Sequence, residues 1–87
     1  MPRFIAVHPT AFKEDDLRAF AARRDELPAV LRWHSCFVAT SDHIAYCEWE
    51  GPDVEMLTEV LEAYGIPFDA IHEVRRFDPA LALLEAA

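Results

Sequence analysis

Short apolar runs with the features of strands are spaced along this chain. Their residues are β-branched or aromatic, and each run is bounded by proline, glycine or small polar residues. The pattern predicts four strands, at about residues 3–8, 32–40, 43–49 and 71–77. The Thr-Ser-Asp sequence between the second and third runs favours a tight turn, so these two strands should form a hairpin.

Two longer segments carry apolar residues at helical spacing. The first is predicted from about Phe12 to about Leu27, with Thr10 as its cap and Pro28 disfavouring the helical conformation at its end. The second begins at Gly51-Pro52-Asp53 and ends before Gly65, which is followed by a proline. After Asp78-Pro79, an alanine- and leucine-rich tail is expected to form a short helix or to fray.

The resulting order, β-α-β-β-α-β, predicts an α+β domain of the ferredoxin-like class spanning residues 1–87. Its four strands should form an antiparallel sheet in the order 4-1-3-2, with both helices on one face. The other face would be left uncovered although it also carries apolar side chains. We therefore expect a homodimer in which two such sheets form a dimeric α+β barrel.

Charge and composition exclude several classes of function. Eight basic and sixteen acidic residues give a net charge of −8, which repels a phosphate backbone and argues against nucleic-acid binding. No apolar run approaches the roughly twenty residues of a membrane span, and no signal peptide is recognised, so we expect no membrane partner and a cytoplasmic location. Two cysteines are too few for a disulfide-stabilised scaffold.

The hairpin register decides which side chains can meet. With a two-residue turn at Ser41-Asp42, paired residues have numbers that sum to 83, so that Cys36 faces Cys47, His34 faces Trp49 and Thr40 faces His43. Alternation then predicts two faces: His34, Cys36, Val38, His43, Ala45, Cys47 and Trp49 on one, and Trp33, Phe37, Ile44 and Tyr46 on the other. A three-residue turn would instead send the two cysteines to opposite faces.

Thiol and imidazole groups on one face suggest a transition-metal site. We expect one group of His34, Cys36 and Cys47, and a second of His8 and His43 near the end of the first strand. Imidazole and thiolate are ligands of nickel, zinc and copper. The alternatives for the cysteines are core thiols or a disulfide, the latter disfavoured in a reducing compartment. Among the remaining groups, Glu48 and Glu50 rank low as ligands, and His72 is an ordinary hydrogen-bonded histidine.

Several short motifs resemble a known family. They are Met-Pro-Arg-Phe-Ile at the start, Trp33-His34-Ser35, the run Cys47-Glu48-Trp49-Glu50-Gly51-Pro52, and Ile71-His72-Glu73-Val74 before Asp78-Pro79. In this order they resemble a family of small bacterial ferredoxin-like proteins of unassigned function that includes an actinobacterial nickel-binding protein. The resemblance implies a homodimeric α+β barrel that takes up transition-metal ions, with ligands at His8, His34 and Cys47. Cys36 departs from the family pattern, in which an aromatic residue follows His-Ser.

Three functions are therefore compared. The preferred hypothesis is a cytoplasmic homodimer that binds a divalent transition metal, nickel first, for metal handling or sequestration. The alternative is a small dimeric-barrel oxygenase, cyclase or isomerase acting on an apolar molecule, with His34 or His8 as general base and Cys36 or Cys47 as nucleophile or redox group. A third is an interaction module whose only function is its dimer. Whether the chain is an enzyme is left open.

Overall fold

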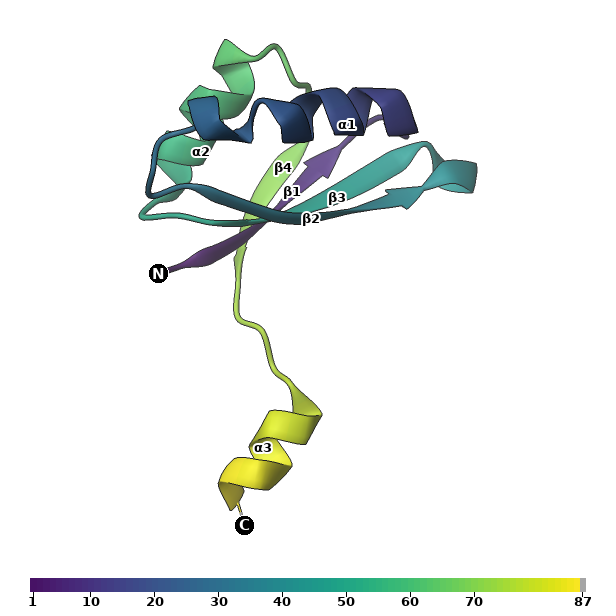
Figure 1. Cartoon of the computed structure of the whole chain (residues 1–87). Helices are drawn as coiled ribbons and strands as arrows, with labels where there is room; N and C mark the ends of the chain where they lie inside the picture. Colours follow the sequence, from purple (N-terminus) through teal and green to yellow (C-terminus); the bar gives the residue numbers. More distant parts are fainter. Residues whose placement is uncertain (87) are drawn as a thin grey trace.

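The four strands form one antiparallel sheet with two helices on a single face. A computed structural model describes residues 1–86 (Figure 1). The sheet has the order β2-β3-β1-β4, which confirms the predicted ferredoxin-like arrangement. Its strands are β1 Arg3–His8, β2 Arg32–Ala39, β3 Ile44–Glu50 and β4 Ala70–Val74, and the covering helices are α1 Glu14–Ala22 and α2 Val54–Ala63.

The core lies between this sheet and the two covering helices. In β1, Phe4, Ala6 and His8 are buried while the residues between them are only half-buried, because successive side chains point to opposite faces. From α2, Leu57 and Leu61 are completely buried against the same face. The opposite face is not covered by helices, and apolar side chains are exposed on it: Phe37 is 63% exposed and Tyr46 is 39% exposed.

A β-bulge in β2 changes which side chains reach each face. Cys36 pairs with Cys47, as predicted, but Trp33 rather than His34 pairs with Trp49, because the register shifts between Trp33 and Ser35. The prediction that His34 shares a face with the cysteines is therefore wrong. Trp33 joins the helix-covered face, and its ring stacks on Trp49 with a centroid distance of 6.1 Å.

The hairpin connection also differs from the predicted two-residue turn. Residues 40–42 form a single turn of 3₁₀ helix, and His43 follows in the left-handed conformation with φ 55° and ψ 41°. Pairing therefore ends at Ala39 and Ile44, and Thr40 and His43 are not a pair. Between this turn and the bulge, the strands nevertheless have the predicted register, so Cys36 still pairs with Cys47.

Helix α1 is shorter than its apolar pattern predicted. It begins at Glu14, and neither Thr10 nor any other side chain caps it. Phe12 lies before the helix, where its ring packs edge-on against His8 at a centroid distance of 5.1 Å. Arg24–Glu26 then form a 3₁₀ turn, and Leu27 is extended before Pro28, as expected for a residue that precedes proline.

The second covering helix has the predicted signals at both ends. Asp53 caps α2 by accepting a hydrogen bond from the backbone N–H of Met56 at 2.8 Å. At its C-terminal end, Gly65 takes a φ of 67°, and the backbone N–H of Ile66 donates to the carbonyl of Leu61 at 2.9 Å. This turn directs the chain into β4.

The C-terminal segment stands away from the sheet (Figure 1). Strand β4 ends at Val74 rather than at Phe77, and helix α3 follows at Pro79–Ala86. Asp78 caps this helix by accepting from the backbone N–H of Ala80 at 3.0 Å. Its leucines are largely exposed: Leu81 by 52%, and Leu83 and Leu84 each by 73%. None of the helices in residues 1–86 has both the length and the apolar character needed to cross a membrane.

Candidate functional site

The two cysteines form a pair of free thiols on the helix-covered face of the sheet. Cys47 is buried, Cys36 is half-buried, and they are direct partners across β2 and β3. The Cys47 thiol donates to the sulfur of Cys36, which lowers the pKa of Cys36 and, together with burial, raises the pKa of Cys47. Cys36 is therefore the more readily ionised of the two.

His34 lies on the other side of the sheet, in the bulge of β2. Its Nε2 atom is 3.0 Å from Oε1 of Glu50, and both side chains are partly exposed. This hydrogen bond is the main reason that the pKa of Glu50 lies below its usual value. Glu48 is on the same face, where it pairs with Arg3 and accepts a hydrogen bond from the Ser35 hydroxyl at 3.1 Å.

His8 is a buried histidine at the end of β1. It is 1% exposed, and its Nδ1 atom lies 2.8 Å from the backbone carbonyl of Pro67. A carbonyl can only accept, so Nδ1 carries the proton of the neutral ring and donates it. Burial lowers the pKa of His8, and the hydrogen bond to Pro67 partly opposes this effect. The imidazole is therefore held in its neutral form.

The first predicted group of metal ligands is divided between the two faces of the sheet, and the second between its buried interior and the turn. His8 pairs with Ala45, so the end of β1 does lie near the start of β3, but His8 is buried while His43 is exposed in the turn. His34 and the cysteines are on opposite faces. Within the part of the chain that the structure describes, no three or more His, Cys, Asp or Glu side chains are arranged to hold a metal ion. Metal ligation by these residues stays a prediction.

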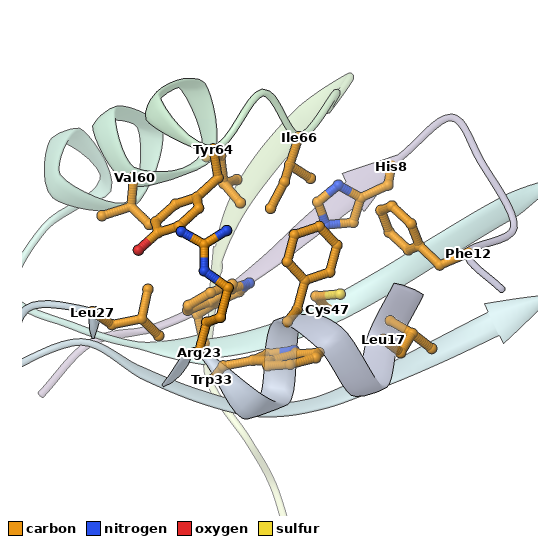
Figure 2. Close-up of a pocket in the computed structure, with 13 residues that line it drawn as sticks. His8, Phe12, Leu17, Arg23, Leu27, Trp33, Cys47, Val60, Tyr64 and Ile66 are labelled. Atoms are coloured by element: carbon orange, nitrogen blue, oxygen red, sulfur yellow. The ribbon is translucent and has the colours of Figure 1, made fainter. Parts of the chain in front are cut away.

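An apolar cavity, which no sequence pattern predicts, lies between the helices and the sheet (Figure 2). Its volume is about 40 Å³, and its walls include Phe12, Phe20, Trp33 and Tyr64. The buried Nε2 of His8 and Nε1 of Trp49 have no hydrogen-bond partner among residues 1–86. The aromatic residues that surround the cavity have the sequence spacing of ordinary core residues, which carries no signal of a cavity.

The comparison with protein-family models identifies this chain's relatives. Residues 4–74 match the family described as "Nickel responsive protein SCO4226-like". The chain belongs to this family. The resemblance inferred from the sequence motifs is therefore confirmed, and the match covers both the thiol pair and the His34–Glu50 pair.

A solved structure of the SCO4226-like family has the same fold. It is described as the crystal structure analysis of SCO4226 from Streptomyces coelicolor A3(2), and it is 26% identical to this chain with a TM-score of 0.68. The similarity covers 87% of this chain and 99% of that one. A search of curated proteins gave no match. The SCO4226-like match ends at residue 74, so α3 lies outside it.

The histidines at positions 8 and 34 and the two cysteines are already engaged in hydrogen bonds of their own. His34 and His8 hydrogen-bond to Glu50 and to the Pro67 carbonyl, respectively, and the two thiols pair with each other. The arrangement offers two kinds of binding chemistry. The open face presents an imidazole beside carboxylates, and the covered face encloses an apolar cavity.

Proposed function

We propose that this protein binds nickel(II) on the open face of its sheet and acts as a homodimer in nickel handling or sequestration. The observation that carries this proposal is the pair formed by His34 Nε2 and Glu50 Oε1, 3.0 Å apart and accessible to solvent, in a member of the nickel responsive family. Nickel(II) accepts imidazole nitrogen readily, and carboxylate oxygen and water can complete its coordination.

The charge around this pair also favours a cation. Glu48 lies on the same face as Glu50, and the pKa values of both carboxyl groups are below their usual values, so both are ionised near neutral pH. Arg3 neutralises Glu48 in part, and the N-terminal amino group lies 3.8 Å from Oε2 of Glu50, which leaves Oε1 of Glu50 as the oxygen that turns from His34 to a metal. A metal ion would replace the hydrogen bond between His34 and Glu50 with two bonds to the ion.

The exposed apolar side chains on the open face are the reason for proposing a homodimer. Phe37 and Tyr46 are exposed on this face, and the half-buried Ile5 and Val7 of β1 share it. A sheet face that exposes apolar side chains in this way is stabilised when a second copy covers them. Because an imidazole–carboxylate pair supplies only two protein ligands, a second copy could also bring further donors to the ion.

Calorimetric titration with nickel(II) tests the site. We expect the double variant His34→Ala/Glu50→Gln to bind nickel at least tenfold more weakly than the unaltered protein. The matched variant Cys36→Ala/Cys47→Ala should keep its affinity, and the nickel-loaded protein should lack sulfur-to-nickel charge-transfer absorption. Identical isotherms for the His34/Glu50 variant and the unaltered protein would reject the site. Loss of binding in the cysteine variant would instead favour the thiolate site that the sequence predicts.

Native mass spectrometry and gel filtration at high dilution test the dimer. We expect a dimer for the unaltered protein and a monomer for Phe37→Glu, because a charge on the open face opposes its burial. His72→Glu, at an exposed position on the other edge strand of the same face, is the matched control and should remain dimeric, because it replaces a polar side chain and removes no apolar contact. A soluble monomer at all concentrations of the unaltered protein would contradict this part of the proposal.

A further inference from the structure

The two cysteines face each other across neighbouring strands of the sheet. Cys36 on β2 is the direct partner of Cys47 on β3, and both are free thiols. Opposed residues of an antiparallel pair lie about 4.5–5.5 Å apart at Cα, and a disulfide spans about 4.4–6.8 Å between the same atoms. Their side chains also point to the same face of the sheet. The backbone therefore already holds the two thiols at a separation that a disulfide can bridge.

The residue pairs on either side of the cysteines fix this arrangement. Ser35 pairs with Glu48, and Phe37 pairs with Tyr46, so the register is continuous across the position of the thiols. The chain has no third cysteine. An oxidised sulfur at Cys36 therefore has a single thiol of its own chain to react with, and that thiol is its neighbour in the sheet.

The two thiols differ in their access to solvent. Cys47 is 4% exposed and belongs to the buried core, whereas Cys36 packs against that core and is only half-buried. The hydrogen bond from the Cys47 thiol lowers the pKa of Cys36, and this pairing and burial together raise the pKa of Cys47. A dissolved oxidant therefore reaches Cys36 first and finds the larger thiolate fraction there.

Cys47 has the position of a second thiol that reacts only with its neighbour. Its side chain lies at the wall of the apolar cavity, which has a volume of about 40 Å³ (Figure 2). The sulfur of Cys47 is therefore not closely packed on every side and can turn toward Cys36 without displacing core side chains. Burial meanwhile protects it from direct attack by an oxidant in solution.

We propose that Cys36 and Cys47 form a peroxide-sensitive dithiol site, in which Cys36 reacts with the peroxide and Cys47 then closes an intramolecular disulfide. The Cys36 thiolate attacks one oxygen of hydrogen peroxide: a sulfur–oxygen bond forms, the oxygen–oxygen bond breaks, and the departing hydroxide takes up the proton that Cys36 released. The Cys47 sulfur then attacks the resulting sulfenic acid, and its proton leaves with the hydroxyl group as water. Two thiols and one peroxide thus become one disulfide and two water molecules.

The disulfide would tie an edge strand to the middle of the sheet, because β2 is at one end of the strand order and β3 is next to it. The site lies on the helix-covered face, opposite the His34–Glu50 pair and away from the face that the proposed dimer covers. It therefore goes beyond the proposed function and does not depend on nickel.

The test treats the reduced protein with hydrogen peroxide and follows its intact mass. We expect a single chain that has lost two hydrogen atoms and that dithiothreitol returns to the starting mass by thiol–disulfide exchange. Cleavage before Asp42 separates the two cysteines, so a disulfide between them will join two peptides. Retention of both thiols, or a disulfide that joins two chains, would overturn the proposal.

Two single variants separate the roles of the thiols. Cys47→Ala should stop the reaction at the sulfenic acid of Cys36, which dimedone captures. Cys36→Ala should be oxidised at least tenfold more slowly than the unaltered protein, because its remaining thiol is buried. Equal rates for Cys36→Ala and the unaltered protein would contradict the assignment. If either variant does not fold, the joined peptides of the unaltered protein decide the pairing.

Two further variants test the geometry and the independence of the site. Cys47→Ala/Tyr46→Cys keeps two cysteines at nearly the same spacing but moves the second to the open face, so it should form no intramolecular disulfide. A disulfide in this variant would show that the pairing in the sheet is not responsible. His34→Ala/Glu50→Gln should be oxidised at the rate of the unaltered protein, and a changed rate would contradict the independence of the two sites.

Discussion

His34 Nε2 lies 3.0 Å from Glu50 Oε1, although the backbone partner of Glu50 in the hairpin is Arg32. The bulge between Trp33 and Ser35 produces this relationship, because the extra residue turns the His34 side chain toward the face that carries Glu48 and Glu50. The same bulge turns Trp33 inward onto Trp49. One irregularity in β2 thus separates the imidazole from the thiols and completes the aromatic wall of the cavity.

Deletion of His34 should convert the bulged hairpin into a regular one. Trp33 would still pair with Trp49 and Ser35 with Glu48, so every other side chain would keep its face. We expect a change in unfolding free energy of less than about 1 kcal/mol, measured by urea denaturation. Deletion of Phe37 is the control: it shifts the register by one residue and should prevent folding. Unfolding of both variants would show that the bulge itself is required.

The buried His8 should make stability depend on pH. Burial holds its pKa below the ordinary value of 6.5, so at lower pH the unfolded chain binds a proton that the folded protein does not. Stability contributed by the neutral ring is fully present above pH 6.5 and decreases as the pH falls below it. We expect a lower urea midpoint at pH 5.5 than at pH 7.5, and a smaller difference in His8→Phe. An equal pH dependence in both proteins would assign the effect to other groups.

Two leucines of helix α2 should account for most of the stability that this helix contributes to the domain. Leu57 and Leu61 are fully buried, whereas Leu83 of α3 is 73% exposed. Truncation of Leu57 to alanine removes buried methyl groups and leaves a cavity, which costs about 2–5 kcal/mol. Leu83→Ala should change the unfolding free energy by less than about 0.5 kcal/mol. Similar losses for both variants, measured by chemical denaturation, would mean that α3 packs on the domain in solution.

The helix caps Asp53 and Asp78 should differ in their effect on the melting temperature. Both accept hydrogen bonds from backbone N–H groups, at 2.8 Å for Asp53 to Met56 and 3.0 Å for Asp78 to Ala80. Asp53→Ala should cost about 1 kcal/mol, because α2 is part of the core. Asp78→Ala should leave the main thermal transition unchanged, because α3 stands away from the sheet. Calorimetry on both variants measures the difference, and equal shifts would contradict it.

The two thiols should react at different rates. Cys36 is half-buried with a lowered pKa, whereas Cys47 is 4% exposed with a raised pKa. Since the thiolate is the nucleophile, brief treatment with iodoacetamide at pH 8 should label Cys36 first. Peptide mass spectrometry locates the label, and Cys36→Ser should leave a nearly unreactive protein. Labelling of Cys47 at the same rate as Cys36 would contradict the buried pairing.

The order of elements could be predicted from the sequence because it depends on local chemistry. The short apolar and β-branched run at residues 3–8 predicts a strand, and its burial alternates, with Phe4, Ala6 and His8 on the covered face. Asp53 and Gly65 mark the limits of α2 through a cap and a positive φ, both of which are properties of single residues. The pairing of Cys36 with Cys47 is the one that the two-residue-turn register predicts, and it is present because the hairpin is regular between its turn and the bulge.

The site depended on features that no local pattern contains. An extra residue in β2 decides whether His34 faces the thiols or the carboxylates, and the choice depends on packing the Trp33 ring onto Trp49. The cavity exists because side chains from β1, α1, α2 and β3 leave a space that none of them fills. Sequence determined the elements and their order, whereas the thiol pair belongs to one of the two registers that it allowed. Tertiary packing decided which polar atoms reach solvent and which are buried without a partner, because burial is a property of all the surrounding elements together.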